Sequence, residues 1–133
     1  MDFKRVSRIH LVINAALVFL FFINKRYLRP NYSNITFFSP ILGSLPNLIG
    51  AFMFSLLPMN KALKLNLHKG RRFIVTSSVF VLAILTYEEF FPYFTASKTF
   101  DYIDILASGL GSSLAIVYYY FLSNEIHKVD SRK

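Results

Sequence analysis

The sequence has no cysteine, and it is poor in charge for a globular protein. The lack of cysteine excludes disulfides, thiolate nucleophiles and thiolate metal ligands at once. Of the 133 residues, 17% are charged and 54% are hydrophobic, whereas ordinary soluble domains have about 25% and roughly 45–50%. Both departures are in the direction that burial in lipid produces, and the length limits the chain to one domain.

Several signatures of function are also missing. The three histidines, His10, His68 and His127, lie far apart and lack the spacing of metal ligands. There is no glycine-rich phosphate loop, no repeat and no low-complexity linker. Although the net charge is +8, the charges form short clusters between apolar runs, which disfavours nucleic-acid binding. We therefore expect no metal, no other cofactor and no nucleic-acid partner.

What the sequence does contain is four stretches without Asp, Glu, Lys or Arg, at residues 9–24, 31–60, 73–87 and 105–124. A helix needs about 20 residues to cross roughly 30 Å of hydrocarbon, and flanking Lys and Arg side chains that reach the interface complete the shorter stretches. We predict an all-α polytopic membrane protein, with residues 1–133 forming a single domain. Its four transmembrane helices are expected at roughly residues 8–25, 42–60, 72–91 and 102–124.

The basic residues indicate an orientation, because short loops rich in Lys and Arg stay on the cytoplasmic side. With both termini inside, eleven Lys and Arg residues lie inside, and only Lys25, Arg26, Arg29 and Lys98 lie outside. We therefore expect both termini in the cytoplasm. The first helix is expected to stay uncleaved, because no small-x-small site follows it.

The connection after the first helix is the least regular part of the sequence, with Pro30, Pro40, Gly43 and Pro46 close together. Proline suits the first turn of a helix, and Ser44 precedes Pro46 as a candidate cap, which places the second helix from near Leu45. Residues 31–43 would then form an apolar outer loop that lies on, or dips into, the outer interface.

The fourth predicted helix has one distinctive face. Asp101, Asp104, Ser108, Gly111 and Ala115 recur at spacings of 3, 4, 3 and 4, which places them on one side of a helix. Small residues allow membrane helices to approach closely. We expect Gly111, Ser112 and Ala115 to pack against another helix, and oligomerisation through this seam is an alternative.

The predicted topology brings polar residues to one outer level. The second helix begins there with Asn47, the third ends there with Glu88 and Glu89, and the fourth begins there with Asp101 and Asp104. Ionisable groups at membrane depth are costly and usually mark a site. Neighbours on a helix point about 100° apart, so only one of Glu88 and Glu89 is expected to face the interior. We predict a ligand-binding outer polar cluster, with helix capping by the aspartates as the alternative interpretation. Its members are Asn47, Glu89, Lys98, Asp101, Asp104 and Ser108, with Arg29 as a further candidate counter-charge.

The sequence resembles the carboxyl-terminal signature of VanZ-like membrane proteins. That signature is a Glu, a Gln three residues later, an Arg in the loop, Phe-Asp-x-x-Asp, an Asn four residues later and a Gly three after that. Glu89, Phe100, Asp101, Asp104 and Gly111 match it in register, whereas Pro92, Lys98 and Ser108 replace the Gln, Arg and Asn. The segment Pro46-Asn47-Leu48-Ile49-Gly50 is similar to the family's earlier polar position. The resemblance implies a bacterial inner-membrane protein of the cell envelope, in a family whose founding members are linked to glycopeptide (teicoplanin) resistance.

These observations favour a non-enzymatic protein whose outer pocket binds a lipid headgroup, a cell-wall precursor or a partner protein. One alternative is a membrane enzyme acting on a lipid, with Glu89 or Asp104 as base and Lys98 as electrophilic stabiliser. Against it stand the missing phosphate loop, the absence of a histidine near the carboxylates and the lack of a metal cluster. The other alternative is an oligomeric transporter or channel element.

Overall fold

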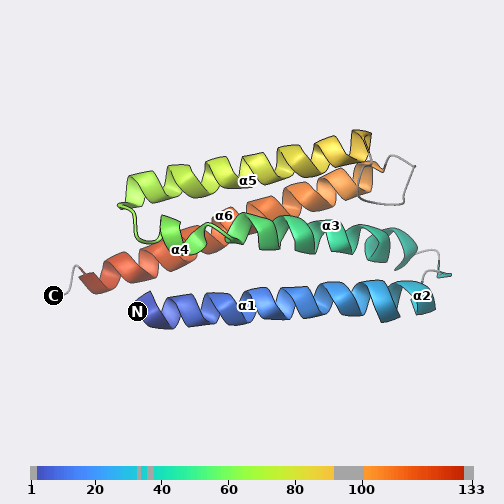
Figure 1. The fold of residues 1–133 in the computed structure, drawn as a ribbon, viewed down its shortest axis with the longest axis horizontal. Coiled ribbons are helices and arrows are strands. Elements are labelled where there is room, and N and C mark those ends of the chain that lie inside the picture. The colour runs from blue at the N-terminus through green and yellow to red at the C-terminus, as the bar shows by residue number, and fades with distance from the viewer. Residues whose placement is uncertain (1–2, 33, 36–37, 92–100, 131–133) are drawn as a thin grey trace.

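A computed structural model describes residues 3–32, 34–35, 38–91 and 101–130, and every regular element in this part of the chain is a helix (Figure 1). In chain order the elements are α1 (Phe3–Ile23), the π-helix η1 (Asn24–Leu28), α2 (Arg29–Tyr32), α3 (Phe38–Leu56), α4 (Met59–Ala62), α5 (Leu67–Phe90) and α6 (Tyr102–Asp130). They form an elongated bundle, and the start of α1 and the end of α6 lie at the same end of it.

Four helical segments of this described part are long and apolar enough to cross a membrane: Arg5–Tyr32, Ser39–Ala62, Leu67–Phe90 and Tyr102–Asn124. Many large apolar side chains on them are exposed, among them Leu11, Phe19, Leu106 and Phe121. Exposed apolar surface of this kind is expected where helices face lipid rather than water. The predicted all-α bundle of four transmembrane helices is therefore confirmed, and the chain is a multi-pass membrane protein.

The first helical segment runs past residue 25, where its end was predicted. The chain continues without a break through η1 and α2 to Tyr32. Lys and Arg are good helix formers, so the basic residues after Ile23 do not end the helix. The wider π-helical turn lies against α3 and buries Asn24 completely.

The predicted start of the second helix is wrong. Helix α3 begins at Phe38, so Phe38–Gly43 is helix rather than outer loop, and Pro46 lies inside the helix. Pro40, not Pro46, occupies the first turn, where a missing N–H costs nothing. Ser44 is no cap, because its Oγ donates a hydrogen bond to the Pro40 carbonyl at 3.0 Å within the helix. The helix ends at Leu56 rather than at residue 60, because Pro58 restricts the residue before it to non-helical backbone.

The other two helices are longer than predicted. Helix α5 begins at Leu67 rather than at residue 72, because the Asn66 side chain caps it by accepting a hydrogen bond from the Lys69 amide at 3.0 Å. Its end at Phe90 lies one residue before the predicted position. Helix α6 begins at Tyr102 as predicted, but it continues to Asp130 rather than ending at residue 124.

Helices α3 and α6 form the centre of the bundle, and α1 and α5 lie on opposite sides of this pair (Figure 1). Gly111 brings α6 against the backbone of α3, and Ser112 and Ala115 are buried beside it. The hydrophobic core lies toward the end that holds the termini, where Leu56, Ile74 and Tyr119 meet. The opposite end is packed less tightly and holds the cavity described next.

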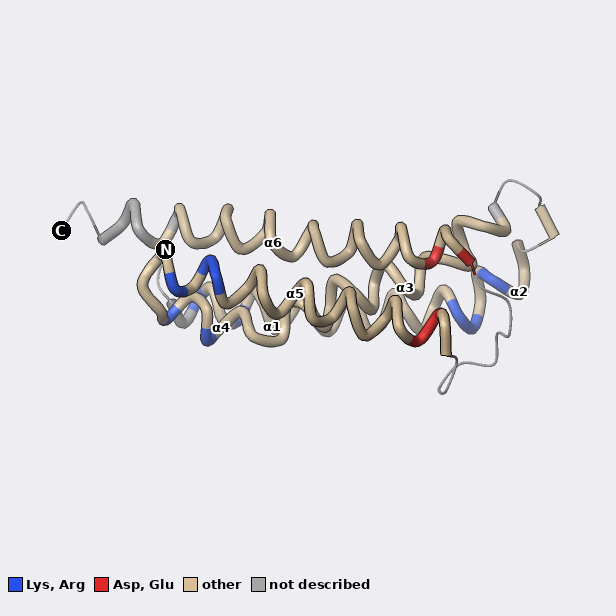
Figure 2. Tube along the Cα trace, turned by 90° about the horizontal axis from the view of Figure 1, so that it is seen from above, with Lys and Arg blue, Asp and Glu red and all other residues tan. Residues whose placement is uncertain are grey.

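Charge divides between the two ends of the bundle (Figure 2). The acidic residues whose side chains the structure describes lie at the end away from the termini, where α5 ends and α6 begins. They are Glu88, Glu89, Asp101 and Asp104. Lys25 and Arg29 share that end with them. The other end carries basic residues, because α1 and α5 begin there and α4 lies there. Among them are Arg5, Arg8, Lys61, Arg71 and Arg72.

Candidate functional site

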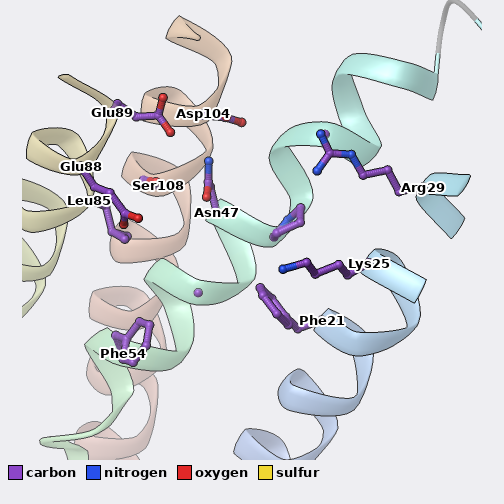
Figure 3. A pocket seen from close by; sticks show the side chains of 13 residues that line it. Phe21, Lys25, Arg29, Asn47, Phe54, Leu85, Glu88, Glu89, Asp104 and Ser108 are labelled. Atoms are coloured by element: carbon purple, nitrogen blue, oxygen red, sulfur yellow. The ribbon is translucent and has the colours of Figure 1, made fainter. Parts of the chain in front are cut away.

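A cavity of about 690 Å³ lies at the end of the bundle away from the termini (Figure 3). Its volume falls within the range of roughly 300–1,000 Å³ that is usual for small-molecule sites. All four membrane-spanning segments contribute side chains to it. The lining residues are Phe21, Lys25, Arg29, Gly43, Pro46, Asn47, Gly50, Phe54, Leu85, Glu88, Glu89, Asp104 and Ser108.

Helix α3 forms the floor of the cavity. Gly43, Asn47, Gly50 and Phe54 recur at spacings of 4, 3 and 4, which places them on one face of the helix. A Cβ atom added at Gly43 or at Gly50 would meet nothing within 4 Å. The two glycines therefore leave open space on either side of Asn47, and part of the cavity exists because they have no side chain.

One wall of the cavity is acidic. The last turns of α5 supply Glu88 and Glu89, and the first turns of α6 supply Asp104 and Ser108. The Asn47 side chain extends from α3 toward this wall and is a hydrogen-bonding neighbour of the Asp104 carboxyl. Asp104 in turn lies close enough to Glu89 for the two carboxyl groups to interact electrostatically.

Two carboxyl oxygens of this wall are buried and have no hydrogen-bond partner among the described residues. They are Oε1 of Glu88 and Oδ1 of Asp104. A buried polar atom without a partner costs free energy, and the cost is larger for a charged group. Both residues line the cavity, so their carboxyl groups have hydrogen-bonding capacity that the described residues leave unused.

The opposite wall is basic. Lys25 comes from η1 and Arg29 from α2, four residues apart on one continuous helical segment. In Figure 3 the Lys25 side chain extends into the cavity from the side of α1, across α3 from Glu88 and Glu89. Arg29 attracts the Asp104 carboxyl electrostatically. The cavity thus presents positive and negative charge on facing sides.

Four of the residues predicted as the outer polar cluster meet in this cavity, namely Asn47, Glu89, Asp104 and Ser108. Asp101 does not line it. Its side chain is exposed and accepts a hydrogen bond from the Ile103 amide at 2.8 Å, which is the capping role that the alternative interpretation gave it. Lys98 lies outside the described residues.

Glu88 and Lys25 also line the cavity, although neither belongs to the predicted outer polar cluster. The expectation that only one of Glu88 and Glu89 faces the interior is wrong, because the cavity is wide enough to take both carboxylates from the end of α5. Lys25 is the last residue of the first helix as predicted from the sequence. Its spacing of four residues from Arg29 was a usable signal, because on a continuing helix that spacing puts both cations on one face.

Among the described residues, no three His, Cys, Asp or Glu side chains are grouped so that they could hold a metal ion. Comparison of the chain with family models, with curated proteins and with solved structures gave no match. The residues of the cavity are therefore the basis for inferring what it binds.

Proposed function

We propose that this protein is a non-enzymatic membrane protein whose cavity binds the zwitterionic headgroup of a phospholipid carrying a primary amine. The observation that carries the proposal is the pairing of an acidic and a basic wall in one cavity at a membrane boundary. An ammonium group donates up to three hydrogen bonds and is complementary to the carboxylates. A phosphate diester is complementary to Lys25 and Arg29.

The depth of the cavity supports a headgroup rather than a water-soluble ligand. Glu88 and Glu89 lie at the end of the span Leu67–Phe90, and Asp104 lies at the start of the span Tyr102–Asn124. These positions correspond to the boundary between the hydrocarbon and the polar region of a bilayer. Charged headgroups and charged side chains meet at this level without either entering the hydrocarbon.

The apolar part of the lining supports an amphiphile. Phe21, Phe54 and Leu85 lie deeper in the bundle than the charged residues, one turn or more toward the membrane centre (Figure 3). Phe54 is 46% exposed, so the cavity continues into the lipid-facing surface of α3. Acyl chains attached to a bound headgroup would follow this surface and stay in the hydrocarbon.

We place the cavity on the outer side of a bacterial inner membrane, with both termini in the cytoplasm. The excess of basic residues at the end that holds the termini supports this orientation through the positive-inside rule. The resemblance to VanZ-like proteins supports a role in the cell envelope, and its link to glycopeptide resistance gives the phenotype to examine first. In this function the partners are membrane lipids.

The test is lipid retention by the purified protein, measured by native mass spectrometry after defined lipids are added. Phosphatidylethanolamine is expected to be retained in preference to phosphatidylcholine, whose quaternary ammonium donates no hydrogen bond. Gly50→Leu, which fills the open space beside Asn47, is expected to lower phosphatidylethanolamine retention by about tenfold or more. The matched control is Gly109→Leu, because a Cβ at Gly109 also meets nothing within 4 Å and Gly109 does not line the cavity.

Four results would contradict the proposal. Equal retention of the two lipids would show that the cavity does not recognise the primary amine, and full retention of phosphatidylethanolamine by Gly50→Leu would show that this lipid binds elsewhere. If a lipid-linked cell-wall precursor were retained in preference to every phospholipid, the ligand would be that precursor rather than a phospholipid. If the protein converted the lipid to a product, and Glu89→Gln abolished this conversion, the protein would be an enzyme rather than a binding protein.

A further inference from the structure

A second cavity, of about 340 Å³, lies at the other end of the molecule, where α5 begins. It shares no lining residue with the first cavity. It is lined by His68, Arg71, Arg72, Val75, Thr76 and Tyr120. None of these residues is acidic, so this cavity has positive charge only, in contrast to the mixed charge of the first one.

The residues of this cavity share one face of α5, since His68, Arg71, Arg72 and Val75 follow the spacings 3, 1 and 3. Tyr120 of α6 forms the other side. The Arg71 guanidinium lies over the Tyr120 ring, with 4.9 Å between the guanidinium carbon and the ring centroid. Stacking on an aromatic ring uses the face of the guanidinium and leaves the N–H groups at its edge free to bind oxygen. Its Nε is buried and has no hydrogen-bond partner in the described part of the chain.

The start of α5 adds to the positive potential. Helix α5 has 24 residues, and no acidic residue lies in its first turn. The N-terminal end of a helix carries partial positive charge, which favours an anion nearby. Arg71 is therefore oriented by Tyr120 in a place where the backbone also attracts negative charge.

The surroundings of the cavity continue into lipid-facing surface. Val79, one turn further along α5, is 58% exposed, and Val117, one turn before Tyr120 on α6, is 63% exposed. Both lie toward the membrane centre from the arginines, because the span of α5 begins at Leu67. An acyl chain would lie along this apolar surface while its headgroup stays beside Arg71 and Arg72.

We propose that this cavity binds the phosphate of an anionic phospholipid at the end of the bundle that holds the termini. Arg71 and Arg72 bind the phosphate oxygens, the Thr76 hydroxyl donates to a third oxygen, and the acyl chains follow the surface formed by Val79 and Val117. Basic pockets between membrane helices are suited to anionic headgroups. The site is independent of the first cavity and of the function proposed for it.

The experiment measures retention of phosphatidylglycerol by native mass spectrometry, with zwitterionic phosphatidylcholine as the reference of zero net charge. Each arginine at the interface contributes about a fivefold gain in binding to anionic lipid, so Arg71→Gln with Arg72→Gln is expected to lower retention on the order of 25-fold. The matched control is Arg5→Gln with Arg8→Gln, which removes the same charge from exposed positions at the same end. An equal fall in phosphatidylglycerol retention in both double variants would show that this cavity is not the binding site.

Three further arms keep the result interpretable. Arg72→Glu leaves the contact between Arg71 and Tyr120 in place, so its loss of phosphatidylglycerol, expected to exceed fivefold, is not a folding effect. Inorganic phosphate and glycerol phosphate are added as competitors, and displacement of the lipid by either at equal concentration would show a site for free phosphate instead. Gly50→Leu is expected to leave phosphatidylglycerol retention unchanged, and a loss in that variant would assign the lipid to the first cavity.

Discussion

Gly111 of α6 lies directly against the backbone carbonyl of Leu48 in α3, with no room between them for a Cβ atom. An added Cβ would also come within 2.9 Å of the Phe52 amide nitrogen. The contact joins the two helices that carry Asn47 and Ser108, each within one turn of it. The position of these side chains in the first cavity therefore depends on a glycine that does not line it.

Gly111→Ala is expected to destabilise the protein by about 1–3 kcal/mol, because the added methyl group forces the two backbones apart. Gly109→Ala is the control on the same helix, since its Cβ meets nothing within 4 Å. Unfolding in detergent, followed by circular dichroism, measures the difference. Equal midpoints for the two variants would show that the close contact does not hold α3 and α6 together.

A second close approach occurs at the other end of the bundle, where Gly70 faces the Tyr119 hydroxyl and the Ala62 carbonyl. Gly70→Ala is expected to lower stability by about 1–3 kcal/mol. Adding Tyr119→Phe removes the clash with the hydroxyl but not the one with the Ala62 backbone, so only part of the stability returns. Full recovery in the double variant would contradict the backbone contact. The same detergent unfolding experiment measures both variants.

The two walls of the first cavity are expected to set lipid preference separately. Glu88→Gln with Asp104→Asn removes charge from the amine side, so the preference for phosphatidylethanolamine over phosphatidylcholine should fall by about fivefold or more. Lys25→Gln with Arg29→Gln removes the phosphate partners and should weaken retention of both lipids. Arg26→Gln serves as control, because Arg26 is exposed and does not line the cavity. If Arg26→Gln changed lipid retention as much as the wall variants do, the two walls would not set the lipid preference.

Orientation is open to a direct test because the chain has no cysteine of its own. Single cysteines introduced as Arg26→Cys and Lys69→Cys occupy exposed positions at opposite ends of the bundle. In intact cells, a maleimide that cannot cross membranes is expected to label Arg26→Cys, whereas Lys69→Cys should react only after permeabilisation. The reverse pattern would place the first cavity on the cytoplasmic side.

The sequence by itself determined the number and nature of the spans. A membrane helix satisfies all its backbone hydrogen bonds within its own segment, so length and lack of charge suffice to predict it. The sequence also predicted that Glu89 and Asp104 lie at the same level of the membrane, because the third helix ends and the fourth begins on the same side. Helix ends were less predictable, because Pro46 is compatible with either the first turn or the interior of a membrane helix, and only packing decides between them.

Only the tertiary structure decided which side chains share a cavity. Lys25 and Glu88 come from helices on opposite sides of α3, and no spacing in the sequence relates them. Whether both line one cavity depends on how closely α3 approaches α6, and on the continuation of the first helical segment beyond Ile23 through η1 and α2. Gly43 and Gly50 likewise become part of a site only because neighbouring helices leave the space above them unfilled. Local patterns fix helices, whereas a cavity is a property of the distances between helices, which depend on contacts far apart in the chain.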